Sequence, residues 1–75
     1  MNDSKVHVAA AFVAEMLGVP QEMIGPDSSM ENTPAWDSME HMIMMLEFER
    51  RFGKSPDMDA ISSATSVRAI AEMMS

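Results

Sequence analysis

Apolar residues recur at helical spacing in residues 2–17. They follow the i, i+3, i+4, i+7 rule and form one stripe, made by Ala9, Phe12, Val13 and Met16 with Val6 and Leu17 alongside. Residues suited to cap a helix precede the stripe at Asn2, Asp3 and Ser4. Gly18 and Pro20 follow it, and both disfavour continuation of a helix. We therefore predict a first helix that ends at about Leu17.

A second helix, predicted over residues 38–52, has two apolar stripes instead of one. With a turn of about 100° per residue, one stripe contains His41, Met44, Met45, Phe48 and Phe52. The other contains Met39, Met42, Ile43 and Leu46. Only the sector of Glu40, Glu47 and Arg51 is consistently polar. A surface helix of a small domain needs one apolar stripe, so the surplus stripe is either further core or an exposed docking surface, for which flexible methionine side chains are well suited.

The ends of this second helix have clear signals. Asp37 and Glu40 have the spacing of a capping box, which makes Ser38 the first helical residue. A residue at that position lies at the positive end of the helix macrodipole, beside backbone N–H groups without an intrahelical partner. Such a position favours a phosphate group. At the other end two arginines suit the negative pole, and Gly53 can take the left-handed conformation that ends a helix.

Residues 19–36 have no sustained period and are rich in proline, glycine and small polar residues. We predict a long structured loop with a short turn near residues 21–24, pinned to the helices by Ile24 and Met30. Trp36 has two interpretations that the sequence leaves open. Its ring either contacts a partner or packs against its own loop.

A short helix is predicted after the second one. Ser55 is a plausible N-cap, Pro56 a plausible first helical residue, and Met58 and Ile61 the expected anchors. Asp57 and Asp59 lack the further ligands and the glycine of a calcium-binding loop, so we expect them to be solvated or capping residues.

A last helix completes the predicted fold. Its cap is Thr65 or Ser66, and its inward face consists of Val67, Ile70, Ala71 and Met74. The expected fold class is therefore all-α. We predict a small antiparallel four-helix bundle, with three main helices, one short helix and a long loop between the first two.

Length and charge narrow the functions that such a fold can have. Seventy-five residues allow a single domain over residues 1–75, which leaves little room for a deep active site. Twelve acidic and five basic residues give a net charge of −7, which disfavours nucleic acid and anionic membrane surfaces as partners. There is no cysteine, so any thiol that the protein uses must arrive on a prosthetic group. Nothing resembles a signal peptide or a membrane span, and the expected location is the cytoplasm.

Two further chemistries have weaker support in the sequence. Eleven methionines could supply soft ligands to copper, but their helical spacing and the lack of a Cys or His cluster favour packing and contact roles. Ser38 and His41, at i and i+3, suggest a serine hydrolase with Asp37 or Glu40 as the orienting acid. The lack of a G-x-S-x-G elbow and the small size of the bundle argue against a hydrolase.

The residues Asp37, Ser38 and Met39, followed by an apolar helix that ends in LEFERRFG, resemble the D-S-L motif and second helix of acyl carrier proteins. The preceding Trp36 makes the motif similar to the W-D-S-L form of many free-standing acyl and aminoacyl carriers. This resemblance extends over nearly the whole chain. It implies that Ser38 is esterified by 4′-phosphopantetheine, that the thiol of this group carries an acyl group as a thioester, and that the protein is not an enzyme.

The resemblance also implies partners. These are a phosphopantetheinyl transferase, a ligase that activates an acyl or amino acid, and downstream acyltransferases or condensing enzymes of fatty acid, polyketide or nonribosomal peptide biosynthesis. We expect the protein to be a monomer. The expected docking residues are Met39, Met42, Ile43, Leu46 and Trp36. The alternative is an unmodified helical interaction module that uses the same methionine-rich face.

One departure from the family indicates which kind of carrier this is. Carriers of fatty acid synthesis usually have an acidic residue at the position of Ile43. An apolar residue there makes docking depend more on hydrophobic contact and less on ionic strength. A dedicated pathway is therefore favoured over general fatty acid synthesis. The sequence identifies neither the cargo nor whether the cargo is held inside the bundle.

Overall fold

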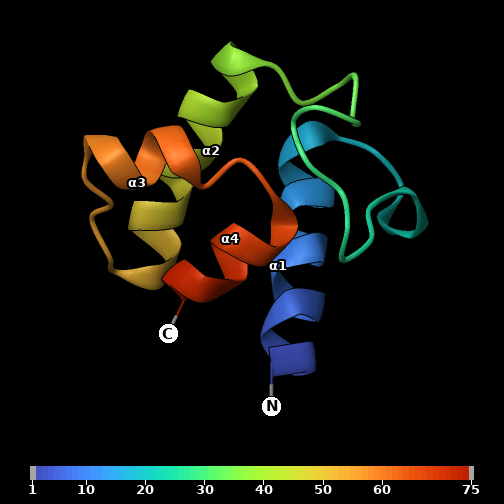
Figure 1. The fold of residues 1–75 in the computed structure, drawn as a ribbon, viewed down its shortest axis with the longest axis horizontal. Coiled ribbons are helices and arrows are strands. Elements are labelled where there is room, and N and C mark those ends of the chain that lie inside the picture. Colours follow the sequence, from blue (N-terminus) through green and yellow to red (C-terminus); the bar gives the residue numbers. More distant parts are fainter. Residues whose placement is uncertain (1, 75) are drawn as a thin grey trace.

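The computed structural model describes residues 2–74, with backbone only at positions 2 and 3, and its regular elements are helical (Figure 1). The elements are α1 (Asn2–Leu17), the 3-10 helix η1 (Gln21–Met23), α2 (Ser38–Phe52), α3 (Met58–Ser63) and α4 (Val67–Met73). The predicted all-α fold is confirmed. The caps predicted at Asn2 and Asp3 involve side chains outside the described part. Ser4 lies inside α1, so the prediction that it could precede the helix was wrong.

The helices form a thin assembly around α1. α4 crosses α1, and α1 also contacts η1 and α2. Figure 1 shows α3 on the far side of α2 from the long loop. The molecule measures 30 × 28 × 18 Å along its principal axes. Since a helix with its side chains is about 10 Å across, the shortest dimension accommodates about two layers of helices.

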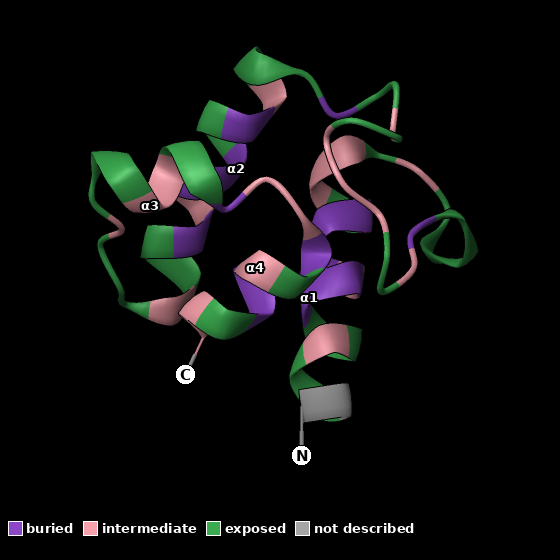
Figure 2. Ribbon diagram, viewed as in Figure 1, coloured by how far each residue is buried: buried purple, intermediate pink, exposed green. Residues whose placement is uncertain are grey.

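Most of the core comes from the predicted inward stripes, and Ala10, Ala14, Ile24, Trp36 and Ala64 add to it. The buried apolar residues are Ala9, Ala10, Phe12, Val13, Ala14, Ile24, Trp36, Met44, Met45, Phe48, Ala64, Val67, Ile70 and Ala71 (Figure 2). Phe12 of α1 meets Phe48 of α2 edge-on, with ring centroids 6.0 Å apart, and it meets Phe52 at 5.7 Å. Edge-to-face pairs of this kind stabilise beyond the area they bury. The aromatic side chains thus join α1 to the C-terminal half of α2.

The long loop is attached to the helices by its side chains and by its backbone. Ile24 is buried, and Met30 packs against the core, so both predicted anchors are confirmed. The backbone adds an isolated antiparallel bridge between Ser29 and Ser66. In it the amide of Met30 donates to the carbonyl of Thr65 at 2.9 Å, and the amide of Val67 donates to Ser28 at 3.0 Å. These bonds join the loop to the α3–α4 connection and offset part of its ordering entropy.

The start of α3 differs from the prediction. Asp57, and not Ser55, is the N-cap, because its side chain accepts a hydrogen bond from the amide of Ala60 at 2.8 Å. Ser55 instead donates its hydroxyl to Glu49 at 2.7 Å. Met58 is 73% exposed and so is no anchor, whereas Ile61 packs against the core as expected. Aspartate and serine are about equally good N-caps, so Asp57 can replace Ser55 in this role when its side chain accepts a hydrogen bond from the amide three residues later.

Candidate functional site

Ser38 is the first residue of α2 and is exposed. Asp37 precedes it with extended backbone, and Asp37 Oδ1 accepts a hydrogen bond from the amide of Glu40 at 2.9 Å. The amide of His41 makes the first intrahelical bond, to the carbonyl of Asp37 at 2.9 Å. The amides of Ser38 and Met39 therefore precede the intrahelical ladder and point out at the positive end of the helix. The predicted start of α2 is confirmed.

The opposite end of α2 is anchored by charge. Glu47 accepts hydrogen bonds from Arg50 at 2.7 and 3.0 Å and from Arg51 at 2.8 Å, which lower its pKa to about 2. Arg51 also pairs with Glu15 of α1, and this hydrogen bond lowers the pKa of the Glu15 carboxyl. The Arg51 guanidinium lies 5.5 Å from the ring centroid of Phe12. Gly53 then ends the helix with a φ of 69°.

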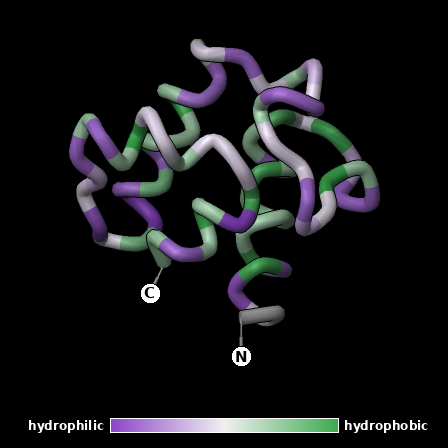
Figure 3. The backbone as a smooth tube through the Cα atoms, in the orientation of Figure 1, coloured by the Kyte–Doolittle hydropathy of each residue, from purple (hydrophilic) through white to green (hydrophobic). Residues whose placement is uncertain are grey.

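The second apolar stripe of α2 is exposed. The exposed fractions are 73% for Met39, 48% for Met42, 46% for Ile43 and 66% for Leu46. We call these four side chains the exposed apolar face. The first stripe is buried at His41, Met44, Met45 and Phe48. Figure 3 shows that hydrophobic and hydrophilic positions alternate along α2 and do not gather at one end. Of the two uses that the sequence allowed for the surplus stripe, the structure excludes further core.

Trp36 does not belong to this surface. Its side chain is 1% exposed and is among the largest fully buried side chains. The prediction that Trp36 is a docking residue was therefore wrong. The other interpretation had the ring packed against its own loop; the ring is packed inside the molecule, with His41 of α2 as its hydrogen-bond partner. The ring can be buried because its N–H has a hydrogen-bond partner in the core. Trp36 Nε1 donates to His41 Nδ1 at 3.1 Å, so burial leaves no unpaired donor.

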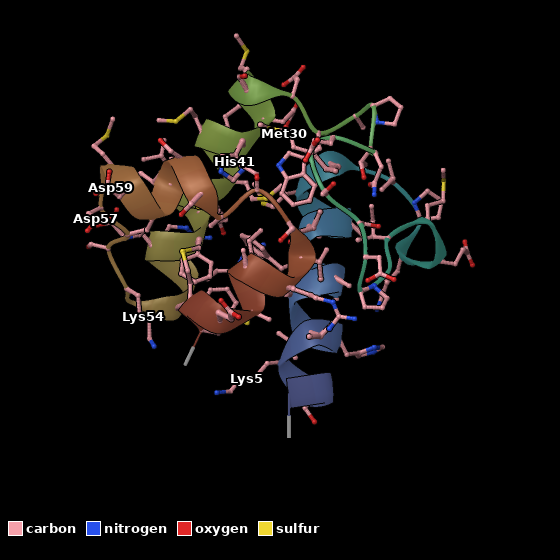
Figure 4. All side chains as sticks on the ribbon, viewed as in Figure 1. Lys5, Met30, His41, Lys54, Asp57 and Asp59 are labelled. Atoms are coloured by element: carbon pink, nitrogen blue, oxygen red, sulfur yellow. The ribbon has the colours of Figure 1, made fainter. Side chains whose placement is uncertain are left out.

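His41 is 4% exposed, and both of its ring nitrogens have partners. Besides the bond from Trp36, His41 Nε2 lies 2.8 Å from the carbonyl oxygen of Ile61 in α3. Figure 4 shows the labelled His41 between α2 and α3. Neither nitrogen is available to take a proton from the exposed Ser38 hydroxyl, and Asp37 is engaged as the helix cap. The hydrolase interpretation is therefore contradicted.

Comparison with known protein families gives a result that fits the exposed serine at the start of α2. A family model for the phosphopantetheine attachment site matches residues 8–74. The chain belongs to this family. A search of curated proteins and one of solved structures found no significant match.

Members of the phosphopantetheine attachment family carry 4′-phosphopantetheine covalently on a serine. The donor set around Ser38 is compatible with such a group. Ser38 is exposed, and it lies beside two amides that precede the intrahelical hydrogen bonds. The exposed apolar face next to it is covered by no other part of the described chain, so this side of α2 is accessible. By contrast, no group of three or more His, Asp and Glu side chains that could hold a metal occurs among the described residues. Within residues 2–74, no helix is long and apolar enough to cross a membrane.

One feature of the site was missed from the sequence. The pairing of Trp36 with His41 fixes the chain on both sides of Ser38. A tryptophan two residues before a helix start and a histidine on the buried stripe were the available signals. They did not show that the two side chains face each other.

Proposed function

We propose that this chain is an acyl carrier that holds an acyl or aminoacyl group as a thioester on 4′-phosphopantetheine attached to Ser38. The observation that carries the proposal is the position of Ser38. It is the exposed first residue of a 15-residue helix, in a chain that belongs to the phosphopantetheine attachment family. When bound, the group supplies the thiol that this cysteine-free chain lacks.

The residues around Ser38 have separate tasks in this proposal. Asp37 fixes the start of α2 by accepting a hydrogen bond from the Glu40 amide. This keeps Ser38 as the first, exposed residue of the helix. The amides of Ser38 and Met39, with the helix dipole, offset the charge of a phosphodiester. The protein itself catalyses nothing. It raises the effective concentration of its cargo at the active sites of partner enzymes.

The proposed docking surface is the exposed apolar face: Met39, Met42, Ile43 and Leu46. It starts one residue after Ser38, so a partner that reaches the serine would contact it. Unbranched methionines adapt to partners of different shape. The proposed partners are a phosphopantetheinyl transferase, an acyl- or aminoacyl-activating ligase, and acyltransferases or condensing enzymes of a dedicated cytoplasmic pathway. Because Ile43 is apolar, their affinity should depend little on salt.

The decisive experiment is intact-mass spectrometry after incubation with coenzyme A and a broad-specificity phosphopantetheinyl transferase. We expect wild-type protein and Ser62→Ala, a control at another exposed helical serine, to gain one phosphopantetheine group each. Ser38→Ala should gain none. A folded wild type that gains nothing, or a gain in Ser38→Ala, would contradict the proposal. The first of these results would favour an unmodified interaction module.

A further inference from the structure

A buried chain of hydrogen bonds runs from the loop through α2 to α3. It begins at Trp36 Nε1, which donates to His41 Nδ1 at 3.1 Å, and it ends at the carbonyl oxygen of Ile61, 2.8 Å from His41 Nε2. Trp36 is 1% and His41 4% exposed. Water therefore competes little for these bonds, and loss of one partner would leave a buried polar group unpaired.

The partners determine the protonation of the imidazole. An indole N–H can only donate, so Nδ1 must accept and carries no proton. A carbonyl oxygen can only accept, so Nε2 must carry a proton and donate it. Both bonds exist together only in the neutral Nε2–H tautomer of His41. The alternative tautomer would set two donors against each other at Trp36 and two acceptors against each other at Ile61.

The Ile61 end of this chain matters because α3 is weakly held. α3 has six residues, and none of them is buried. A helix of that length is unstable by itself. Its last carbonyls have no continuing helical amide, and that of Ile61 instead accepts a hydrogen bond from His41 Nε2. The imidazole thus caps α3 from another helix.

The Trp36 end matters because of its place beside Ser38. Trp36 comes two residues before Ser38, and His41 comes three residues after it. Their hydrogen bond closes a ring of chain that contains the Asp37 cap and the Ser38 hydroxyl. The Trp36 amide also donates to the carbonyl of Thr33 at 2.9 Å, which fixes the approach to this turn.

We propose that His41 is a positioning residue that couples the Ser38 turn to α3. While its imidazole holds both partners, the turn and the neighbouring helix keep one arrangement. When either bond is lost, α3 loosens and the turn samples several arrangements. The effect on Ser38 modification rests on the proposed function, whereas the coupling between Trp36, His41 and Ile61 does not.

The coupling is tested by NMR on the unmodified protein. We expect the ¹⁵N spectrum of the His41 ring to show a protonated Nε2 and an unprotonated Nδ1. We expect His41→Leu and Trp36→Phe to speed hydrogen exchange at the amides of Ile61 in α3 and of Ala64, which caps its C-terminus, by about tenfold, as for the loss of one buried hydrogen bond. Exchange at the α4 amide of Ile70 should change much less, which separates local loosening from global destabilisation.

Gln replaces His as the conservative variant, since its side-chain oxygen can accept from Trp36 while its nitrogen donates to Ile61. His41→Gln should restore slow exchange. His7→Leu is the matched control, because His7 is exposed on α1. A charged His41 ring, the opposite tautomer, or unchanged α3 exchange in both His41→Leu and Trp36→Phe would overturn the coupling.

The positioning role is tested by transferase kinetics. Suppose that only one of several arrangements of the Ser38 turn can bind the transferase. The KM for the carrier then rises by the inverse of the fraction of molecules in that arrangement, while kcat stays the same. We expect KM about tenfold higher for His41→Leu and Trp36→Phe, near wild type for His41→Gln, and unchanged for His7→Leu. Loosened α3 with an unchanged KM would overturn the positioning role. If wild type is not modified at all, the proposed function fails, and the NMR results alone decide the coupling.

Discussion

The two apolar faces of α2 are made of the same kind of residue and have opposite environments. Met44 and Met45 are 0% and 2% exposed, whereas Met39 and Met42 are 73% and 48% exposed. The buried pair contributes to folding free energy through area removed from water and close packing. The exposed pair contributes little to folding. An exposed apolar patch of this kind is typical of a contact surface, which is the role proposed for it above.

The largest difference between the faces should appear in stability. Met44→Ala deletes a fully buried side chain and is expected to lower the free energy of unfolding by about 2–5 kcal/mol. Met42→Ala, one face away on the same helix, should change it by no more than about 0.5 kcal/mol. Urea unfolding followed by circular dichroism measures both. Comparable losses in the two variants would show that the exposed face is part of the folded core in solution.

An intermediate effect is expected in partner binding. Leu46→Ala truncates the exposed apolar face, and KM for the phosphopantetheinyl transferase should rise about tenfold, as for a contributing interface residue. Stability should stay near that of wild type, because Leu46 is 66% exposed.

Met23→Ala is the control for this experiment. Met23 is 68% exposed but lies on η1, outside the exposed apolar face. An equal rise in KM for Met23→Ala would mean that the partner responds to exposed apolar area in general, and the assignment of the docking surface to α2 would be wrong. Repeating the wild-type assay at increasing ionic strength sharpens the result, since contact through apolar side chains should change KM little.

The smallest effect is expected on the polar side of α2. Hydrogen bonds from Arg50 and Arg51 lower the Glu47 pKa from 4.5 to about 2 in the folded protein. A depressed carboxyl pKa stabilises the fold above about pH 4.5, and the contribution disappears as the pH falls toward 2. Glu47→Gln should therefore lower Tm slightly at pH 7 and hardly at all at pH 2. A Tm difference that stays the same from pH 7 to pH 2 would show that the ion pairs are not its source.

The boundaries of α2 were predictable because their signals are local. Asp37 accepts from an amide three residues later, and Gly53 needs only its own left-handed backbone. The periodicity likewise separated the stripe of Met44 and Phe48 from the stripe of Met42 and Leu46. Interactions of this range are decided within one or two turns of helix, so sequence reasoning captured them.

The start of α3 was less predictable, although its signal is also local. Ser55–Pro56 and Asp57 are rival starts within three residues, and spacing alone does not rank them. In the structure Ser55 is engaged by Glu49, and Asp57 is left to accept the amide of Ala60. With this later start Met58 is the first residue of α3 and is exposed, whereas Ile61, one turn later, packs against the core as predicted.

The sequence by itself determined an all-α chain with Ser38 at the start of a helix that has two apolar faces. Only the tertiary structure decided which face is covered, that Trp36 is buried, and that His41 joins it to Ile61. The physical reason is that periodicity places residues on a face but contains no information on what packs against it. The His41–Ile61 bond spans 20 residues, and its existence depends on how α3 folds back against α2.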